Sequence, residues 1–206
     1  MTEQIKMNVS TKLTLARLFA TPVLVLCLNA DFPGNYLLSL AVFLAAVATD
    51  YLDGRIARSR GETTNLGILL DPLADKILIS AAFISFIGNA TVRLPAWMVI
   101  VIVSREFAIT GLRLLTAGKG IILPAGLWGK HKTVSQMAAV VLILIYLCLW
   151  NYAPEQMESC RPALLALVSI TVVLTISSGF IYVVSNRRLF SSQAPPPPAS
   201  SAGSSR

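Results

Sequence analysis

Four aspartates stand at the edges of two apolar stretches and make up the most conspicuous chemical group in the chain. They are Asp50, Asp53, Asp71 and Asp75. Each residue of an α-helix turns by about 100°, so spacings of three and four place both members of each pair on one helix face. The segment between the pairs is short enough for an antiparallel hairpin, which would gather all four carboxylates at one end.

Like charges at these spacings repel one another, and divalent cations resolve that conflict. Oxygen ligands without His or Cys suit Mg²⁺, Mn²⁺ or Ca²⁺. Four aspartates can hold two such ions across a diphosphate, as in many phosphoryl transfers. The alternative is that they only cap helix ends among lipid headgroups. A carboxylate at membrane depth costs about 2.5–3.5 kcal/mol, so four together favour the metal site.

Small residues and one cation accompany the aspartates. Gly54 and Ala57 lie near the face of the first pair and leave room for a ligand to approach the backbone. Gly67 would do the same for the second pair if the helix extends that far. Pro72 argues against this extension, because it cannot donate to residue 68, and it marks the first helical turn instead. Arg58 is placed to contact a phosphate or a base.

The composition predicts an all-α integral membrane protein. Of 206 residues, 55% are hydrophobic and 13% are charged, whereas soluble domains carry about 25% charged residues. Six apolar stretches approach the roughly 20 residues that a membrane-spanning helix needs. They are Leu13–Asn29, Tyr36–Asp53, Leu70–Ile87, Pro95–Leu115, Thr133–Trp150 and Ala163–Val184. The sequence therefore predicts a six-transmembrane-helix bundle over residues 13–186.

The two ends of the chain differ from the bundle. Residues 1–12 are polar and weakly amphipathic, which predicts a short N-terminal surface helix. Residues 187–206 are rich in Pro and Ser and cannot bury apolar area, which predicts a disordered tail. The proline run is either a ligand for a domain that binds polyproline helices or solvated chain without a partner.

The net charge of +7 is spread in clusters between apolar stretches, which favours topology signals over a nucleic-acid-binding arm. One side of the predicted membrane receives Lys6, Lys12, Arg55, Arg58, Arg60, Lys119, Lys130, Lys132, Arg187 and Arg188. The other side receives Arg93 and Arg161. By the positive-inside rule, both termini and the aspartates face the cytoplasm.

The aspartates and small residues together reproduce a family signature. The pattern is D-x2-D-G-x2-A-R-x8-G-x3-D-x3-D, with eight fixed positions across 26 residues, and every position is matched. This pattern resembles the signature of the CDP-alcohol phosphotransferases. The resemblance implies a six-helix membrane enzyme, usually a homodimer, that transfers a phosphatidyl group from CDP-diacylglycerol to an alcohol and releases CMP.

The resemblance also implies roles for individual residues. The four aspartates would bind Mg²⁺ or Mn²⁺, with two ions expected, and Asp75 would also deprotonate the acceptor hydroxyl. The CDP moiety would contact Gly54, Ala57, Arg58 and Gly67.

Three outer segments resemble the bacterial phosphatidylglycerophosphate synthases of this family, whose acceptor is glycerol 3-phosphate. They are "TKLTLARLFATPVLV", "SREFAITGLR" and "GKHKTVSQ". This resemblance implies a bacterial-type inner membrane. The candidates for the acceptor phosphate are Arg105, Arg113, Lys130 and Lys132. The two arginines fall about 80° apart around one helix and can line a common cavity. The alternatives are membrane anchoring for the lysines and a structural pair with Glu106 for Arg105.

Other functions stay open at this point. Another member of the family would use inositol phosphate, serine or phosphatidylglycerol as its acceptor. An intramembrane prenyltransferase also places aspartates and Mg²⁺ on a diphosphate, and a cation transporter also carries carboxylates, although near the membrane midplane. The roles of Arg17 and His131 are not decided by the sequence.

Overall fold

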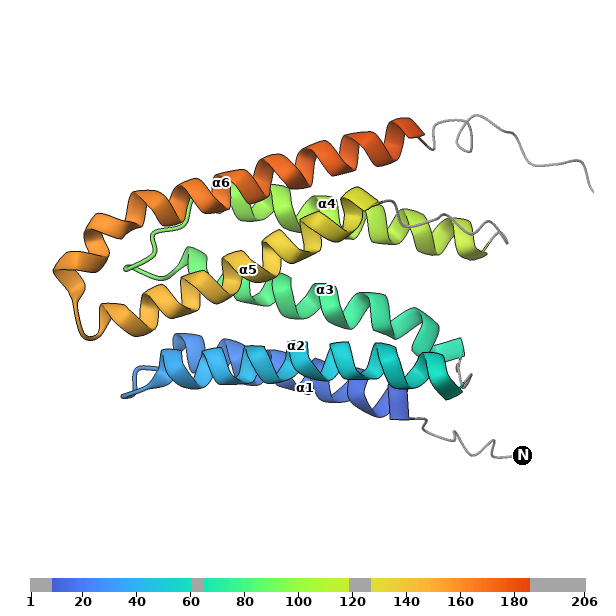
Figure 1. Cartoon of the computed structure of the whole chain (residues 1–206), viewed down its shortest axis with the longest axis horizontal. Coiled ribbons are helices and arrows are strands. Elements are labelled where there is room, and N and C mark those ends of the chain that lie inside the picture. Colours follow the sequence, from blue (N-terminus) through green and yellow to red (C-terminus); the bar gives the residue numbers. More distant parts are fainter. Residues whose placement is uncertain (1–8, 61–64, 119–126, 186–206) are drawn as a thin grey trace, which may run out of the picture.

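The computed structural model describes residues 9–60, 65–118 and 127–185, which form six α-helices. They are α1 (Val9–Asn29), α2 (Asn35–Arg60), α3 (Asn65–Ile87), α4 (Ala96–Gly118), α5 (Leu127–Trp150) and α6 (Pro154–Ser185). Each helix runs antiparallel to the one before it, so they form an up-and-down bundle (Figure 1). The predicted all-α class is therefore confirmed for the described part of the chain.

The bundle has two distinct ends. One end carries the short connections after α1, α3 and α5 (Figure 1). The other end carries the starts of α1, α3 and α5 and the ends of α2, α4 and α6. At the first end, the chain turns at Gly34 with φ of 84°, a left-handed conformation that favours glycine. Asn89 Oδ1 accepts hydrogen bonds from the backbone N–H groups of Thr91 and Val92, which fixes the connection before α4.

Apolar side chains fill the interior and also cover much of the outside. Phe43, Phe83, Phe86 and Leu147 are fully buried between the helices. Large apolar side chains also point outward from several helices. They include Phe19, Leu26, Trp97, Ile100, Val173 and Phe180. Exposed large apolar side chains on several helices are consistent with a lipid-facing exterior.

The helices differ in how clearly they qualify as membrane spans. Among the described residues, Lys132–Trp150 and Pro154–Ser185 are long and apolar enough to cross a bilayer by length and composition. Shorter apolar helices cover Leu15–Asn29, Asn35–Thr49 and Lys76–Ile87. The fold is thus consistent with a helical membrane protein, and the number of spans and their orientation belong to the proposal below.

Several helices extend beyond their apolar stretches. At the aspartate end, α2 continues to Arg60 and α3 begins at Asn65, so polar residues there are also helical. The prediction that Pro72 marks the first turn of its helix is wrong: α3 starts earlier and includes both Gly67 and Pro72. A proline removes one backbone hydrogen bond, and the rest of the helix can still form around it.

At the N-terminus, residues 9–12 are continuous with α1. The remainder of the predicted surface helix and the predicted tail lie outside the described residues.

Candidate active site

The two aspartate pairs lie on two consecutive helices. Asp50 and Asp53 belong to α2, and Asp71 and Asp75 belong to α3, so both pairs have the helical spacing that the sequence predicts. The C-terminal part of α2 and the N-terminal part of α3 lie at the same end of the bundle (Figure 1). The side chains of residues 50–72, 75 and 117–131 lie outside the described part of the structure, so metal coordination stays a prediction.

The same limit applies to other predicted residues. Gly54, Ala57 and Arg58 are on α2 and Gly67 is on α3, so these residues, predicted to lie in the connection between the two apolar stretches, are helical. Lys130 and His131 are on α5, and their side chains are not described. Within the described side chains, no group of three or more His, Cys, Asp or Glu lies together as a metal site. The four aspartates are not among the side chains to which that finding applies.

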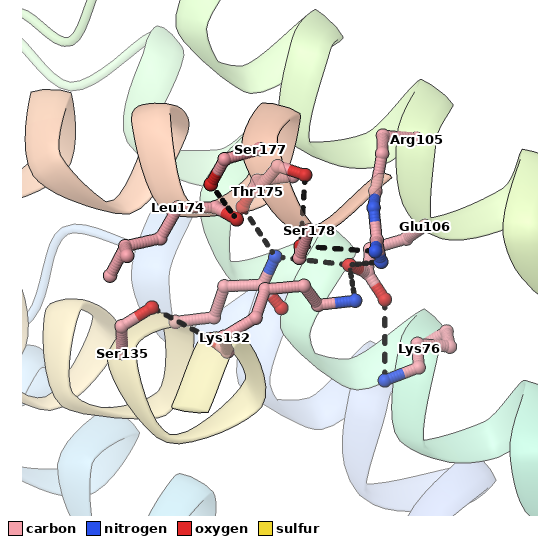
Figure 2. A network of polar contacts seen from close by, with 10 residues as sticks. Lys76, Arg105, Glu106, Lys132, Ser135, Leu174, Thr175, Ser177 and Ser178 are labelled. Atoms are coloured by element: carbon pink, nitrogen blue, oxygen red, sulfur yellow. Dashed lines mark hydrogen bonds and ion pairs between the residues drawn. The ribbon is translucent and has the colours of Figure 1, made fainter. Parts of the chain in front are cut away.

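A buried carboxylate joins cations from three helices. Glu106 on α4 is 3% exposed. Its Oε2 lies 3.3 Å from Lys76 Nζ of α3, and its Oε1 lies 3.3 Å from Arg105 Nη1 and pairs with Lys132 Nζ of α5 (Figure 2). We call Lys76, Arg105, Glu106 and Lys132 the Glu106 cluster. Glu106 is therefore the residue that brings these cations together.

Polar residues of α5 and α6 complete the surroundings of the cluster. Gln136 is fully buried, and its Nε2 donates to Glu106 Oε1 at 3.2 Å and to Thr175 Oγ1 at 3.3 Å. Arg105 Nη2 donates to Ser178 Oγ at 3.0 Å (Figure 2). Buried polar groups are costly without partners, so these contacts explain why polar residues are tolerated inside an apolar bundle.

The charges of the Glu106 cluster do not cancel. Three cations accompany one carboxylate, which leaves a formal charge of +2 on the four side chains. Arg105 Nε and Arg113 Nε are buried and have no hydrogen-bond acceptor among the described residues. Positive charge and available N–H donors in a low-dielectric site favour an anion, and arginine binds phosphate or carboxylate in bidentate geometry.

Both candidate arginines of α4 face α6. Arg105 contacts Ser178, and the guanidinium carbon of Arg113 lies 5.2 Å from the ring centroid of Tyr182. This shared direction agrees with their 80° spacing around α4. The expected alternative for Arg105, a pair with Glu106, is present in the structure. The guanidinium also donates a hydrogen bond to Ser178, so the pair with Glu106 is one of its two polar contacts among the described residues.

Lys132 and Arg17 are both buried, which bears on the alternatives considered for each of them. Lys132 is buried and paired with Glu106, which differs from the exposed position expected of a residue that only anchors the helix at the membrane surface. Arg17 on α1 is buried as well, so its side chain does not extend to the surface of the bundle.

Sequence reasoning missed Lys76 and the central place of Glu106. A signal was present for Lys76, because it is a charged residue inside an apolar stretch, directly after an aspartate of the signature. No comparable signal pointed to Gln136, Thr175 or Ser178. Their roles depend on packing between helices that are far apart in the sequence.

The all-helical bundle, its apolar exterior and its charged end define a class of membrane-associated helical proteins, and comparison with known proteins gives the family. The chain belongs to the CDP-alcohol phosphatidyltransferase family, whose model matches residues 7–184. The resemblance on the signature is thereby confirmed at the family level.

Curated relatives cover most of the chain. One is the CDP-diacylglycerol–glycerol-3-phosphate 3-phosphatidyltransferase of Bacillus subtilis, which is 40% identical over 191 residues, or 87% of this chain and 95% of the relative. A protein of the same name from Pseudomonas fluorescens is 35% identical, over 67% of this chain and 72% of the relative. Another, from Haemophilus influenzae, is 32% identical, over 84% of this chain and 90% of the relative.

Proposed function

We propose that this protein transfers the phosphatidyl group of CDP-diacylglycerol to sn-glycerol 3-phosphate, giving phosphatidylglycerophosphate and CMP for phospholipid biosynthesis. The observation that carries the proposal is the 32–40% identity, over most of the chain, to relatives named for this reaction. Membership of the family disfavours the intramembrane prenyltransferase and the cation transporter.

The aspartate end is proposed to carry the chemistry. The four aspartates fit two Mg²⁺ or Mn²⁺ ions, because they offer hard oxygen donors in two helical pairs. Such ions would neutralise negative charge on the diphosphate and stabilise CMP as the leaving group. Asp75 would accept the proton of the acceptor hydroxyl as its oxygen bonds to phosphorus and the bond to CMP breaks. The CDP moiety would lie against Gly54, Ala57, Arg58 and Gly67.

The Glu106 cluster is proposed to bind the phosphate of the acceptor, together with Arg113 and Lys130. One contact supports a common site for both substrates. Lys76 follows Asp75 directly in α3, and its Nζ lies 3.3 Å from Glu106 Oε2. The candidate base and one residue of the cation cluster are therefore consecutive in α3, which places the two proposed subsites at the same level of the bundle.

An assay with labelled acceptors tests the proposed reaction. Purified protein, CDP-diacylglycerol and Mg²⁺ would be supplied in parallel with glycerol 3-phosphate, inositol phosphate, serine or phosphatidylglycerol. We expect lipid product and CMP with glycerol 3-phosphate. Product from another alcohol instead would keep the family mechanism and overturn the proposed acceptor.

Replacing Arg105 by lysine should weaken acceptor binding selectively. Lysine keeps the charge but loses the planar guanidinium that bonds both Ser178 and Glu106. A hydrogen bond to a charged group contributes about 1.5–3 kcal/mol, so KM for glycerol 3-phosphate should rise roughly 10- to 100-fold. KM for CDP-diacylglycerol should stay near its wild-type value. Equal increases in both constants would contradict the assignment of Arg105 to the acceptor.

We further propose six membrane spans, with both termini and the aspartate end facing the cytoplasm. Arg93 lies in the connection between α3 and α4, and Arg161 lies in the first turns of α6. Both elements are at the end of the bundle with the short connections (Figure 1), which supports this orientation. The homodimer implied by the resemblance stays a prediction.

Cysteine labelling tests the orientation with a residue that the chain already has. Cys160 is exposed near the start of α6, whereas Cys27 is buried. In right-side-out membrane vesicles, a membrane-impermeant maleimide should label Cys160, and Cys160→Ser should abolish the signal. A cysteine introduced into the tail as Ser201→Cys, in the Cys160→Ser background, should react only after permeabilisation. The reverse pattern would invert the topology.

A further inference from the structure

The α6 helix makes direct contact with both arginines proposed for the acceptor. Its buried residues near the aspartate end include Thr175, Ser178, Gly179 and Tyr182. Spacings of three and four residues place these residues on one side of the helix. Ser178 accepts a hydrogen bond from Arg105, Tyr182 lies under Arg113, and Thr175 contacts Gln136. No position of the family signature falls on α6.

Gly179 is the position where Arg105 passes closest to the α6 backbone. A Cβ atom added there would lie 3.0 Å from Arg105 Nε and 3.2 Å from Arg105 Cγ. Both distances are shorter than ordinary van der Waals contacts between such atoms. The absence of a side chain at residue 179 therefore leaves the space that the Arg105 side chain occupies.

The neighbours of Arg105 limit how far its side chain could move if a Cβ atom were added at residue 179. Its Nη2 is bonded to Ser178 Oγ at 3.0 Å, and its Nη1 is 3.3 Å from Glu106 Oε1. Ser178 Oγ in turn donates to the carbonyl oxygen of Thr175 at 3.0 Å, which orients the hydroxyl. A shift of a few tenths of an ångström at Arg105 would therefore lengthen at least one of these bonds.

We infer that Gly179, with Ser178, is a specificity-determining positioning element of α6 that sets where the Arg105 guanidinium meets the acceptor phosphate. This inference rests on the proposed function, in which Arg105 binds that phosphate. Gly179 and Ser178 would not contact the metals or the CDP moiety. They would act through Arg105, so their effect should fall on the acceptor alone.

The main test is Gly179→Ala, with Gly111→Ala as the matched control. Gly111 is also helical, on α4, and a Cβ added there would have nothing within 4 Å. Displacing a substrate-positioning group by about 1 Å can cost 100-fold, so a smaller shift at Arg105 should raise KM for glycerol 3-phosphate by about tenfold. KM for CDP-diacylglycerol should change less than about twofold. Gly111→Ala should leave both constants near wild type.

Thermal stability separates positioning from a folding defect. Alanine is a better helix former than glycine, so neither alanine variant should unfold at a much lower temperature than the wild type. If Gly179→Ala does fail to fold, Ser178→Ala decides instead. It removes the hydroxyl that accepts from Arg105 and donates to the Thr175 carbonyl, without adding atoms. This variant should raise KM for glycerol 3-phosphate several-fold and leave KM for CDP-diacylglycerol near its wild-type value.

A double-mutant cycle shows whether Gly179 acts through Arg105. In an Arg105→Gln background, Gly179→Ala should no longer change KM for glycerol 3-phosphate, because the positioned group is gone. An unchanged acceptor KM in folded Gly179→Ala, or a full effect in the Arg105→Gln background, would overturn the inference and leave the proposed function intact. Wild-type protein that makes no phosphatidylglycerophosphate would overturn both.

Discussion

Replacing Asp75 by asparagine is expected to lower kcat by roughly 10³-fold, within the 10²–10⁴-fold range typical of general acid–base groups. Asparagine keeps the size and one oxygen of the side chain but cannot accept the proton of the acceptor hydroxyl. It also removes one negative charge from the proposed metal ligands. The measurement is the initial rate of CMP release with saturating CDP-diacylglycerol, glycerol 3-phosphate and Mg²⁺.

Two further variants make this experiment specific. Asp71→Asn removes a proposed metal ligand but not the proposed base, so higher Mg²⁺ should recover more of its activity than that of Asp75→Asn. Asp31→Asn makes the same chemical change in the connection between α1 and α2, at the opposite end of the bundle, and should keep wild-type rates. Wild-type kcat in Asp75→Asn would exclude Asp75 as the base.

The elements that the sequence predicts well depend on local pattern. Apolar length and turn residues predicted six helices, and the helix ends at Asn29, Ile87 and Trp150 coincide with the predicted ones. The aspartate spacings also predicted helical pairs correctly, because a helix fixes the angle between residues three or four apart.

The helix ends near the aspartates were predicted poorly, because they do not coincide with the ends of the apolar stretches. At the aspartate end, helices extend through polar residues, because backbone hydrogen bonding does not require apolar side chains. The preference of proline for the first turn of a helix predicts that α3 begins near Pro72. The helix instead begins at Asn65, because the loss of one backbone hydrogen bond does not prevent the rest of the helix from forming.

Apart from the Arg105–Glu106 pair, the contacts of the Glu106 cluster and of the polar residues around it could not be predicted, because they join distant parts of the chain. Gln136 and Thr175 are 39 residues apart, and Arg105 and Ser178 are 73 residues apart. Which polar residue of one helix meets which residue of another depends on helix rotation and tilt. In a membrane protein these are set by close packing rather than by burial of apolar surface from water. Spacing along a single helix carries no information on that contact.

Glu106→Gln should be the most destabilising of the substitutions considered. Glutamine is close to glutamate in size, but it leaves the cations of Lys76, Arg105 and Lys132 without the carboxylate they share. Removing one partner of a buried ion pair typically costs about 3–5 kcal/mol. We expect a clearly lower unfolding temperature in detergent and little remaining activity, because the acceptor arginine loses one of its fixed partners.

The control for this change is Glu158→Gln. Glu158 also pairs with an arginine, Arg161, at 3.2 Å, but its side chain is 52% exposed. Exposed pairs contribute about 0.2–1 kcal/mol, so this variant should be nearly as stable as the wild type. Both variants replace glutamate by glutamine, so a difference in their unfolding temperatures would be due to the burial and the shared contacts of Glu106.

A second substitution distinguishes charge imbalance from lost packing. In Glu106→Gln combined with Lys132→Met, one of the repelling cations is also removed, so the double variant should be more stable than Glu106→Gln alone. Its activity should stay low, because a cation proposed to bind the acceptor phosphate is missing. Stability that falls further in the double variant would show that Lys132 contributes through packing. Full activity in Glu106→Gln would show that the cations do not need Glu106 to position them.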